Sequence, residues 1–122
     1  MITTLIVDDE NDIRSLIRLV VETANHGLAV VGEAADGEEA LRRWRSDSPV
    51  IIVLDNRMPG LTGIDVAKQI LSEAPEQRIV LFSAHLDSDT MREARRIGIQ
   101  RCLDKTQIAG LPDELLSLAP PA

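Results

Sequence analysis

Residues 50–55 of the chain read VIIVLD, an unbroken aliphatic run that ends in an acid. Because its first five side chains are all apolar, the run is typical of a central parallel strand that helices cover on both faces. Similar aliphatic runs occur elsewhere in the chain, with a weaker one near its end: Leu5–Val7, Leu28–Val31, Ile79–Phe82 and Arg101–Asp104. Together these runs predict five strands.

Helical periodicity fills the gaps between the strands. From Ile13 to Ala24, apolar residues recur at the three- and four-residue spacing of one helix face. The same spacing predicts four more helices, around residues 40–44, 64–71, 91–97 and 111–118. Helix-end signals accompany them: the capping-box pairs Asp36/Glu39 and Thr62/Asp65, and a left-handed cap at Gly98. This alternation predicts an α/β fold, a doubly wound parallel sheet between two helix layers.

The length and the composition of the chain exclude several classes of function. A chain of 122 residues predicts one domain, spanning 1–122. Aromatic residues make up 2% and the net charge is −7, which excludes base-stacking platforms and direct nucleic-acid binding by this domain. No run approaches the length of a membrane span, and the N-terminus lacks a signal-peptide pattern. A single cysteine, Cys102, fits a reducing compartment. We therefore expect a cytoplasmic protein without membrane contact.

Polar residues follow the predicted strands. Asp8-Asp9-Glu10 follow the first strand, Asp55 the third, Ser83 the fourth and Lys105 the fifth. Each has an ordinary explanation as a turn, capping or surface residue. However, open parallel sheets build their sites at the carboxyl ends of the strands, where all of these residues fall. Clustered carboxylates repel unless a cation lies between them, which favours Mg²⁺, and a carboxylate beside a cation and a lysine suits phosphoryl transfer.

The motifs at these positions resemble those of one family. They are Val7–Glu10, Leu54–Gly63 with its Asp-x-x-Met-Pro-x-x-x-Gly pattern, Phe82–Ala84 and Cys102–Lys105. With them, the sequence resembles the receiver domain of two-component response regulators from Ile2 to about Leu118. The resemblance implies a flavodoxin-like sheet with strand order 2-1-3-4-5.

The resemblance also implies residue roles. Asp55 would accept a phosphoryl group from a sensor histidine kinase or a phosphotransfer protein. Asp9 would bind Mg²⁺ directly and Asp8 through water, with the Asp55 carboxylate and the Arg57 backbone carbonyl as further ligands. Ser83 would hydrogen-bond the transferred group, and Lys105 would pair with its oxygens. Met58-Pro59 and Gly63 would shape the loop, and the small Ala84 would border the phosphoryl group's entry.

Two positions depart from the family pattern. The family usually places a proline with a cis bond after its lysine, whereas Thr106 follows Lys105 here. A cis bond to threonine would cost about 2.5–4 kcal/mol, so either a trans bond or strain is expected. Cys102 occupies the position of an aromatic residue that usually turns inward on activation. The resemblance therefore implies intact phosphoacceptor chemistry, whereas the aromatic residue of the usual output mechanism is missing.

These features predict a phosphoacceptor switch and not a turnover enzyme, although it could dephosphorylate itself. A degenerate receiver that only binds partners is the alternative. An aspartyl phosphatase is disfavoured because Arg57 stands where its second aspartate would be, and the acids after the first strand disfavour a nucleotide site.

A group of basic residues has two possible explanations. It forms either a solvated basic face or a surface for an unknown downstream protein or a homodimer, on the face of the fourth helix, fifth strand and fifth helix. These residues are Arg92, Arg95, Arg96 and Arg101. His85 is either a solvated loop residue or an influence on hydrolysis. The chain is expected to be a stand-alone receiver.

Overall fold

The structure, a computed structural model, describes residues 1–24 and 27–120. Strands and helices alternate along the chain in the order β1 (Ile2–Val7), α1 (Asn11–Ala24), β2 (Leu28–Ala34), α2 (Gly37–Asp47), β3 (Ile51–Leu54), α3 (Gly63–Glu73), β4 (Arg78–Ser83), α4 (Ser88–Ile97), β5 (Arg101–Asp104), the 3₁₀ helix η1 (Lys105–Gly110) and α5 (Leu111–Leu118). No helix in these described ranges combines the length and the apolar character needed to cross a membrane.

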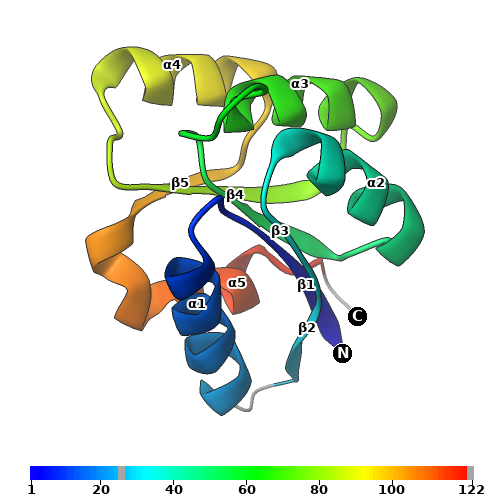
Figure 1. The fold of residues 1–122 in the computed structure, drawn as a ribbon, viewed down its shortest axis with the longest axis vertical. Coiled ribbons are helices and arrows are strands. Elements are labelled where there is room, and N and C mark those ends of the chain that lie inside the picture. Colours follow the sequence, from blue (N-terminus) through cyan, green and yellow to red (C-terminus); the bar gives the residue numbers. More distant parts are fainter. Residues whose placement is uncertain (25–26, 121–122) are drawn as a thin grey trace.

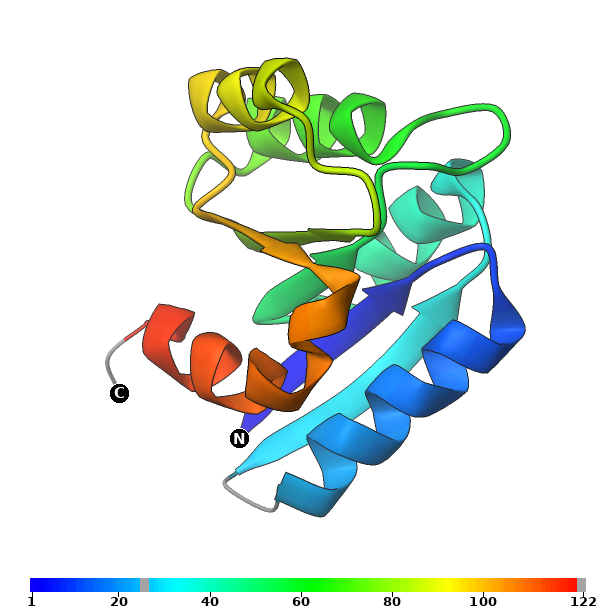
Figure 2. The same cartoon turned by 90° about the vertical axis from the view of Figure 1, so that its left-hand side faces the viewer.

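The strands form one parallel sheet in the order β2-β1-β3-β4-β5. Helices α2, α3 and α4 cover one face of the sheet, and α1 and α5 cover the other (Figures 1 and 2). Both the doubly wound three-layer class and the strand order predicted from the sequence are confirmed.

The central strand β3 contributes to a separate apolar core on each face. Ile52 and Leu54 pack in the cluster under α2, α3 and α4, whereas Ile51 and Val53 pack in the cluster under α1 and α5. All four side chains are at most 1% exposed. A strand buried on both faces cannot place a polar residue at either set of alternating positions, which explains the uniform aliphatic run.

Several element boundaries differ from the sequence predictions. β2 continues to Ala34, past the predicted end at Val31, and its pairing with β1 skips one residue: Thr4 pairs with Val30 and Leu5 with Gly32. Gly32 and Glu33 interrupt the aliphatic run near the end of the strand, so a search for such runs does not detect the extension. The 3₁₀ helix at Lys105–Gly110 was not predicted, since it has no helix-like apolar periodicity.

The helix caps confirm most of the predicted signals. Thr62 and Asp65 form a complete capping box, in which each side chain accepts from the other's backbone amide. Asp36 accepts from the amide of Glu39 as expected, but the Glu39 side chain accepts from the Ala35 amide instead of the Asp36 amide. Gly98 ends α4 in the left-handed conformation, with φ of 102°.

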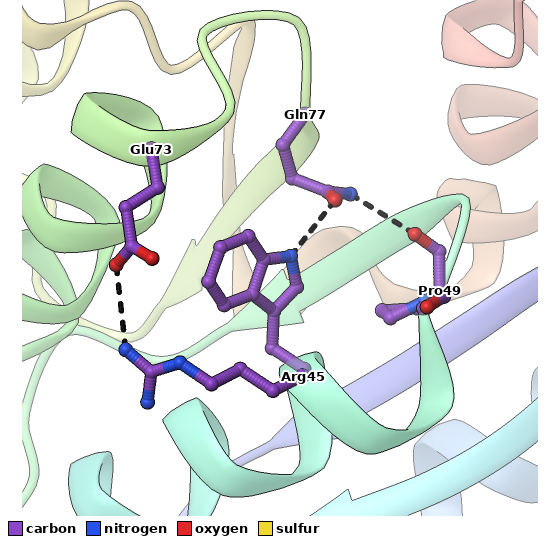
Figure 3. Close-up of a pocket in the computed structure, with 6 residues that line it drawn as sticks. Arg45, Pro49, Glu73 and Gln77 are labelled. Atoms are coloured by element: carbon purple, nitrogen blue, oxygen red, sulfur yellow. Dashed lines mark hydrogen bonds and ion pairs between the residues drawn. The ribbon is translucent and has the colours of Figure 1, made fainter.

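The Gln77 side chain connects several elements at the amino-terminal edge of the sheet through hydrogen bonds. Its side-chain oxygen accepts from the Trp44 indole nitrogen at 3.0 Å, and its amide nitrogen donates to the Pro49 carbonyl at 3.2 Å (Figure 3). The same nitrogen lies within 3.1 Å of the Val50 carbonyl and 3.2 Å of the Arg78 carbonyl. One side chain therefore joins α2, the start of β3 and the start of β4, on the edge opposite the polar residues that follow the strands.

Candidate functional site

Each of four strands delivers a polar side chain to one edge of the sheet. Asp8 follows β1, Asp55 follows β3, Ser83 ends β4 and Lys105 follows β5. The parallel registers align the last residues of β1 with those of β3, and the last residues of β4 with those of β5. Asp8, Asp55 and Ser83 are at most 3% exposed. The structure thus brings together four residues that lie far apart in the sequence, and it buries three of them.

Lys105 contacts two of the carboxylates. Its Nζ lies 2.7 Å from Oδ2 of Asp8 and 3.5 Å from Oδ2 of Asp55. Burial and the negative charge of Asp8 raise the pKa of the Asp55 carboxyl, although the Lys105 ammonium opposes this shift. Burial alone would lower the pKa of Lys105, but its contacts with Asp8 and Asp55 raise it. Two carboxylates thus share one ammonium, which leaves a net negative site that a further cation would stabilise.

The loop after β3 holds Asp55 in place. The Asn56 side-chain oxygen accepts from the Ile64 amide at 3.0 Å, and the Gly63 amide donates to the Asn56 carbonyl at 3.0 Å. A Cβ atom on Gly63 would overlap the backbone carbonyl of Asp55, so only glycine lets α3 begin this close. The backbone amide of Arg57 lies 3.4 Å from Oδ1 of Asp55. These bonds fix the position of Asp55 relative to the first turn of α3.

The residues after β1 fit a metal ion. Asp8, Asp9 and Glu10 each offer a carboxylate oxygen, and these oxygens lie within 4.8 Å of one another. Oδ2 of Asp8 is buried and makes no hydrogen bond, apart from its ionic contact with Lys105. Oδ1 of Asp8 accepts from the Glu10 amide at 2.9 Å. An all-oxygen set of this charge is the chemistry that Mg²⁺ prefers, so the donor set fits this ion.

A cavity of about 260 Å³ opens beside Asp55, lined by Asp9, Glu10, Asp55, Arg57, Ser83, Ala84, His85 and Lys105. Asp9 and Glu10 are exposed, whereas Asp8 is buried beneath them. From the sequence, Arg57 is expected to bind the ion only through its backbone carbonyl, and Glu10 has no separate role. Both residues line the cavity, and their closeness to Asp55 and Asp9 in the sequence was the available signal.

Comparison with known protein families matches residues 4–116 to the response regulator receiver domain. The chain belongs to this family. Response regulator UvrY of Escherichia coli strain K12 is 29% identical over 117 residues, which cover 96% of this chain and 52% of that protein. Transcriptional regulatory protein LiaR of Bacillus subtilis is 33% identical over 109 residues, 89% of this chain and 51% of that protein. The receiver thus spans about half the length of these curated relatives.

Solved structures of other receivers have the same fold. The response regulator domain of Thermotoga maritima CheB superposes with a TM-score of 0.84 at 29% identity, covering 96% of this chain and 92% of that one. A two-component response regulator of the LuxR family from Aurantimonas gives a TM-score of 0.89 at 32% identity, covering 95% and 83%. The flavodoxin-like class predicted from the sequence is that of these neighbours.

The bond after Lys105 is trans in this receiver, as every peptide bond is in the described ranges. The Thr106 amide donates to Oδ1 of Asp104 at 2.9 Å, and the Gln107 side chain accepts from the Asp104 amide at 2.9 Å. This capping box begins η1 directly at Lys105. A proline at position 106 would lack the amide hydrogen that Asp104 binds. The threonine therefore supports the lysine through a local hydrogen bond.

Cys102 lies on β5 and is partly buried against the core under α4. Burial raises the pKa of its thiol, although the nearby Arg95 opposes the shift. A cysteine has a far smaller side chain than the aromatic residue usual in the family, so less surface is available to move between buried and exposed states.

Proposed function

We propose that this receiver, residues 1–122, accepts a phosphoryl group on Asp55 from a sensor histidine kinase or a phosphotransfer protein, with Mg²⁺ bound, and that the phosphorylated form binds partners differently. The observation that carries the proposal is the pair of contacts from Lys105 to Asp8 and Asp55. Burying two carboxylates beside an ammonium at the edge of a cavity costs free energy of folding. A receiver that only binds partners would gain nothing that offsets this cost.

The transfer would use the Asp55 carboxylate as nucleophile. One of its oxygens attacks the phosphorus of a phosphohistidine, and the new O–P bond forms as the N–P bond breaks. The imidazole nitrogen keeps the electron pair of the broken bond and takes a proton from water. The Lys105 ammonium, 3.5 Å from Asp55, is placed to balance charge on the phosphoryl oxygens. Ser83 lines the same cavity and supplies a hydroxyl that can donate to one of those oxygens.

Asp9, Asp8, the Asp55 carboxylate and the Arg57 carbonyl would hold the magnesium ion, with Glu10 close enough to contribute through water. When bound, this ion neutralises charge on the carboxylates and on the phosphoryl oxygens. Before it binds, the Lys105 ammonium partly offsets the repulsion between Asp8 and Asp55. Phosphorylation should therefore depend on Mg²⁺.

Water attack on the phosphorus would later regenerate Asp55 and release inorganic phosphate, so the protein resets itself without turning over an external substrate. The imidazole of His85 is exposed at the cavity, where it can influence this hydrolysis. A phosphohistidine donor is made with ATP, which fits the cytoplasmic location expected from the sequence. The downstream partner is a protein that distinguishes the two forms.

Intact-mass measurement tests the proposal. Incubation with acetyl phosphate and Mg²⁺ should add one phosphoryl group to the wild type and to Asp12→Asn, but none to Asp55→Asn. Asp12 is a suitable control because it is an exposed aspartate in the first turn of α1. Equal labelling of all three proteins would refute the assignment of Asp55. No labelling of the wild type would favour the alternative, a receiver that acts only as an interaction module.

A further inference from the structure

The side chain of Arg14, on α1, reaches back to the segment that carries the acids after β1. We call this segment, Asp8–Glu10, the acidic loop. Nη1 of Arg14 donates to the backbone carbonyl of Asp8 at 2.6 Å, and Nη2 donates to the side-chain oxygen of Asn11 at 3.1 Å. The Arg14 side chain is only 14% exposed, so little water competes for these bonds. The guanidinium therefore binds the backbone of the acidic loop.

A carboxylate on β2 holds this guanidinium in place. Nε of Arg14 lies 3.1 Å from Oε1 of Glu33, and Nε of Arg18, one helical turn later, lies 2.7 Å from Oε2 of the same carboxylate. Helix α1 lies alongside β2, so these contacts join the two elements (Figure 2). The Asp8 amide also donates to the Ala34 carbonyl at 3.1 Å. Arg14 thus connects the acidic loop to a support that extends from α1 to the end of β2.

The bond to the Asp8 carbonyl bears on the direction of Asp9. The carbonyl of Asp8 and the amide of Asp9 belong to one rigid peptide plane, so a rotation of this plane would turn the Asp9 side chain. Asp9 lines the cavity beside Asp55, whereas the Asp8 side chain is already held by Lys105. A group that fixes this plane therefore orients the acid that faces the cavity. Groups that orient metal ligands commonly change metal affinity by tenfold or more.

We propose that Arg14 is a positioning residue of the magnesium site, which aims Asp9 at the ion by fixing the peptide plane between Asp8 and Asp9. The inference deepens the proposed function and rests on it for the presence of Mg²⁺ at the acidic loop. As a positive charge near this loop, the guanidinium by itself repels Mg²⁺. The positioning effect of Arg14 on Mg²⁺ affinity and the effect of its charge therefore have opposite signs.

A calorimetric Mg²⁺ titration of Arg14→Gln, without a phosphodonor, uses this difference in sign. Loss of the bond to the Asp8 carbonyl should weaken Mg²⁺ binding about tenfold, whereas loss of the positive charge alone would strengthen it. Arg14→Lys keeps the charge but lacks the planar fork that lets arginine donate to three acceptors. It should also bind Mg²⁺ more weakly than the wild type does, and it provides the test if Arg14→Gln does not fold.

Arg18→Gln is the matched control. It makes the same change in net charge and removes a bond to the same carboxylate, that of Glu33. The hydrogen bonds of Arg18 found among the described residues go to Glu33 and Glu22, and neither residue belongs to the acidic loop. Its Mg²⁺ affinity should therefore stay within about twofold of the wild type. Amide NMR during the titration should place the Mg²⁺-induced shifts in the acidic loop of each protein.

The rate of labelling by acetyl phosphate gives a second measurement. Arg14→Gln should need about tenfold more Mg²⁺ for the half-maximal rate, but it should approach the wild-type rate at saturating Mg²⁺. This split is expected because the contact between Lys105 and Asp55 does not involve Arg14. A variant that merely lost part of its folded structure would have a lower maximal rate at every Mg²⁺ concentration.

Two results would overturn the proposal. Mg²⁺ binding by Arg14→Gln that is as tight as that of the wild type, or tighter, would show that the guanidinium does not orient the loop. An equal weakening in Arg18→Gln would assign the effect to the shared contact with Glu33. Failure of acetyl phosphate to label the wild type would instead overturn the proposed function. The calorimetric titration needs no phosphodonor, so it decides the role of Arg14 separately.

Discussion

Asp8 and Asp9 are adjacent in the sequence but have different surroundings. Asp8 is 1% exposed and is held by Lys105 and by the Glu10 amide. Asp9 is exposed and lines the cavity beside Asp55. A residue that already has partners is suited to orienting a ligand or a bound water, whereas one that faces the cavity can coordinate an ion directly. The two acids should therefore contribute unequally to metal binding.

Magnesium affinity measures this difference. Asp8→Ala should weaken Mg²⁺ binding about tenfold, the effect typical of groups that orient ligands, and Asp9→Ala should weaken it more. Asp12→Ala removes an exposed acid from the first turn of α1 and serves as the control for net charge. Calorimetric titration gives the affinities. If the wild type and both site variants bound Mg²⁺ equally, the ion would lie elsewhere.

Ser83 and Cys102 should differ in how they transmit a signal. Ser83 lines the cavity beside Asp55 and is followed by the exposed segment that leads to α4, whereas the Cys102 side chain has little surface to rotate. We expect Ser83→Ala to reduce phosphorylation-dependent partner binding or dimerisation strongly, and Cys102→Ala to leave it nearly unchanged. The opposite ranking, in a binding assay with and without acetyl phosphate, would assign the signal to Cys102.

At the scale of elements, Gln77 shows what sequence patterns miss. It precedes β4 in a polar stretch and matches no motif, yet its side chain joins Trp44 of α2 to the starts of β3 and β4. Periodicity places Trp44 in the helix predicted around residues 40–44, and Trp44 packs against the core. Its hydrogen-bond partner could not be predicted, because the two residues are 33 positions apart and only the completed fold brings them together.

Loss of Gln77 should therefore destabilise the protein. Gln77→Ala leaves an indole nitrogen and several partly buried carbonyls without their partner, at a cost of about 2 kcal/mol in the free energy of unfolding. Gln69→Ala removes an exposed glutamine from α3 and should cost less than about 0.5 kcal/mol. Urea denaturation compares the two variants. If both variants lost a similar amount of unfolding free energy, the hydrogen bonds of Gln77 would contribute no more to stability than a surface contact does.

The contact between α1 and β2 makes stability depend on pH. Partial burial would raise the pKa of Glu33, but its bonds with Arg18 and Arg14 outweigh this effect and lower it below 4.5. Because the pKa of Glu33 is lower in the folded protein than in the unfolded one, its bonds stabilise the fold fully at pH values above the unfolded-state pKa. This stabilisation is lost as the pH falls through the folded-state pKa. Glu33→Gln should thus reduce stability by about 1 kcal/mol at neutral pH, and the difference should vanish in acid.

Glu76→Gln is the matched control, since Glu76 is exposed and no ion pair involves its side chain among the described residues. Thermal unfolding of both variants between pH 7 and pH 3 provides the comparison. A deficit for Glu33→Gln that stayed constant across this range would show that the lost stability does not come from the ionised carboxylate.

For the whole molecule, the fold was largely predictable because of β3. Its aliphatic run requires a layer of helices on each face, and the alternation of strands and helices then requires parallel pairing. The same reasoning placed Asp8, Asp55, Ser83 and Lys105 at one edge. What it missed depends on contacts that only the completed fold makes, such as the hydrogen bond from the Trp44 indole nitrogen to Gln77.

A phosphoryl group on Asp55 should change the segment from Ser83 through α4, and with it the binding of partners. Two-dimensional amide NMR, recorded before and after phosphorylation with acetyl phosphate and Mg²⁺, tests it directly. We expect large shifts from Ser83 through α4 and in β5, and small ones in β2 at the far edge of the sheet. Complete phosphorylation with shifts confined to the immediate neighbours of Asp55 would contradict it.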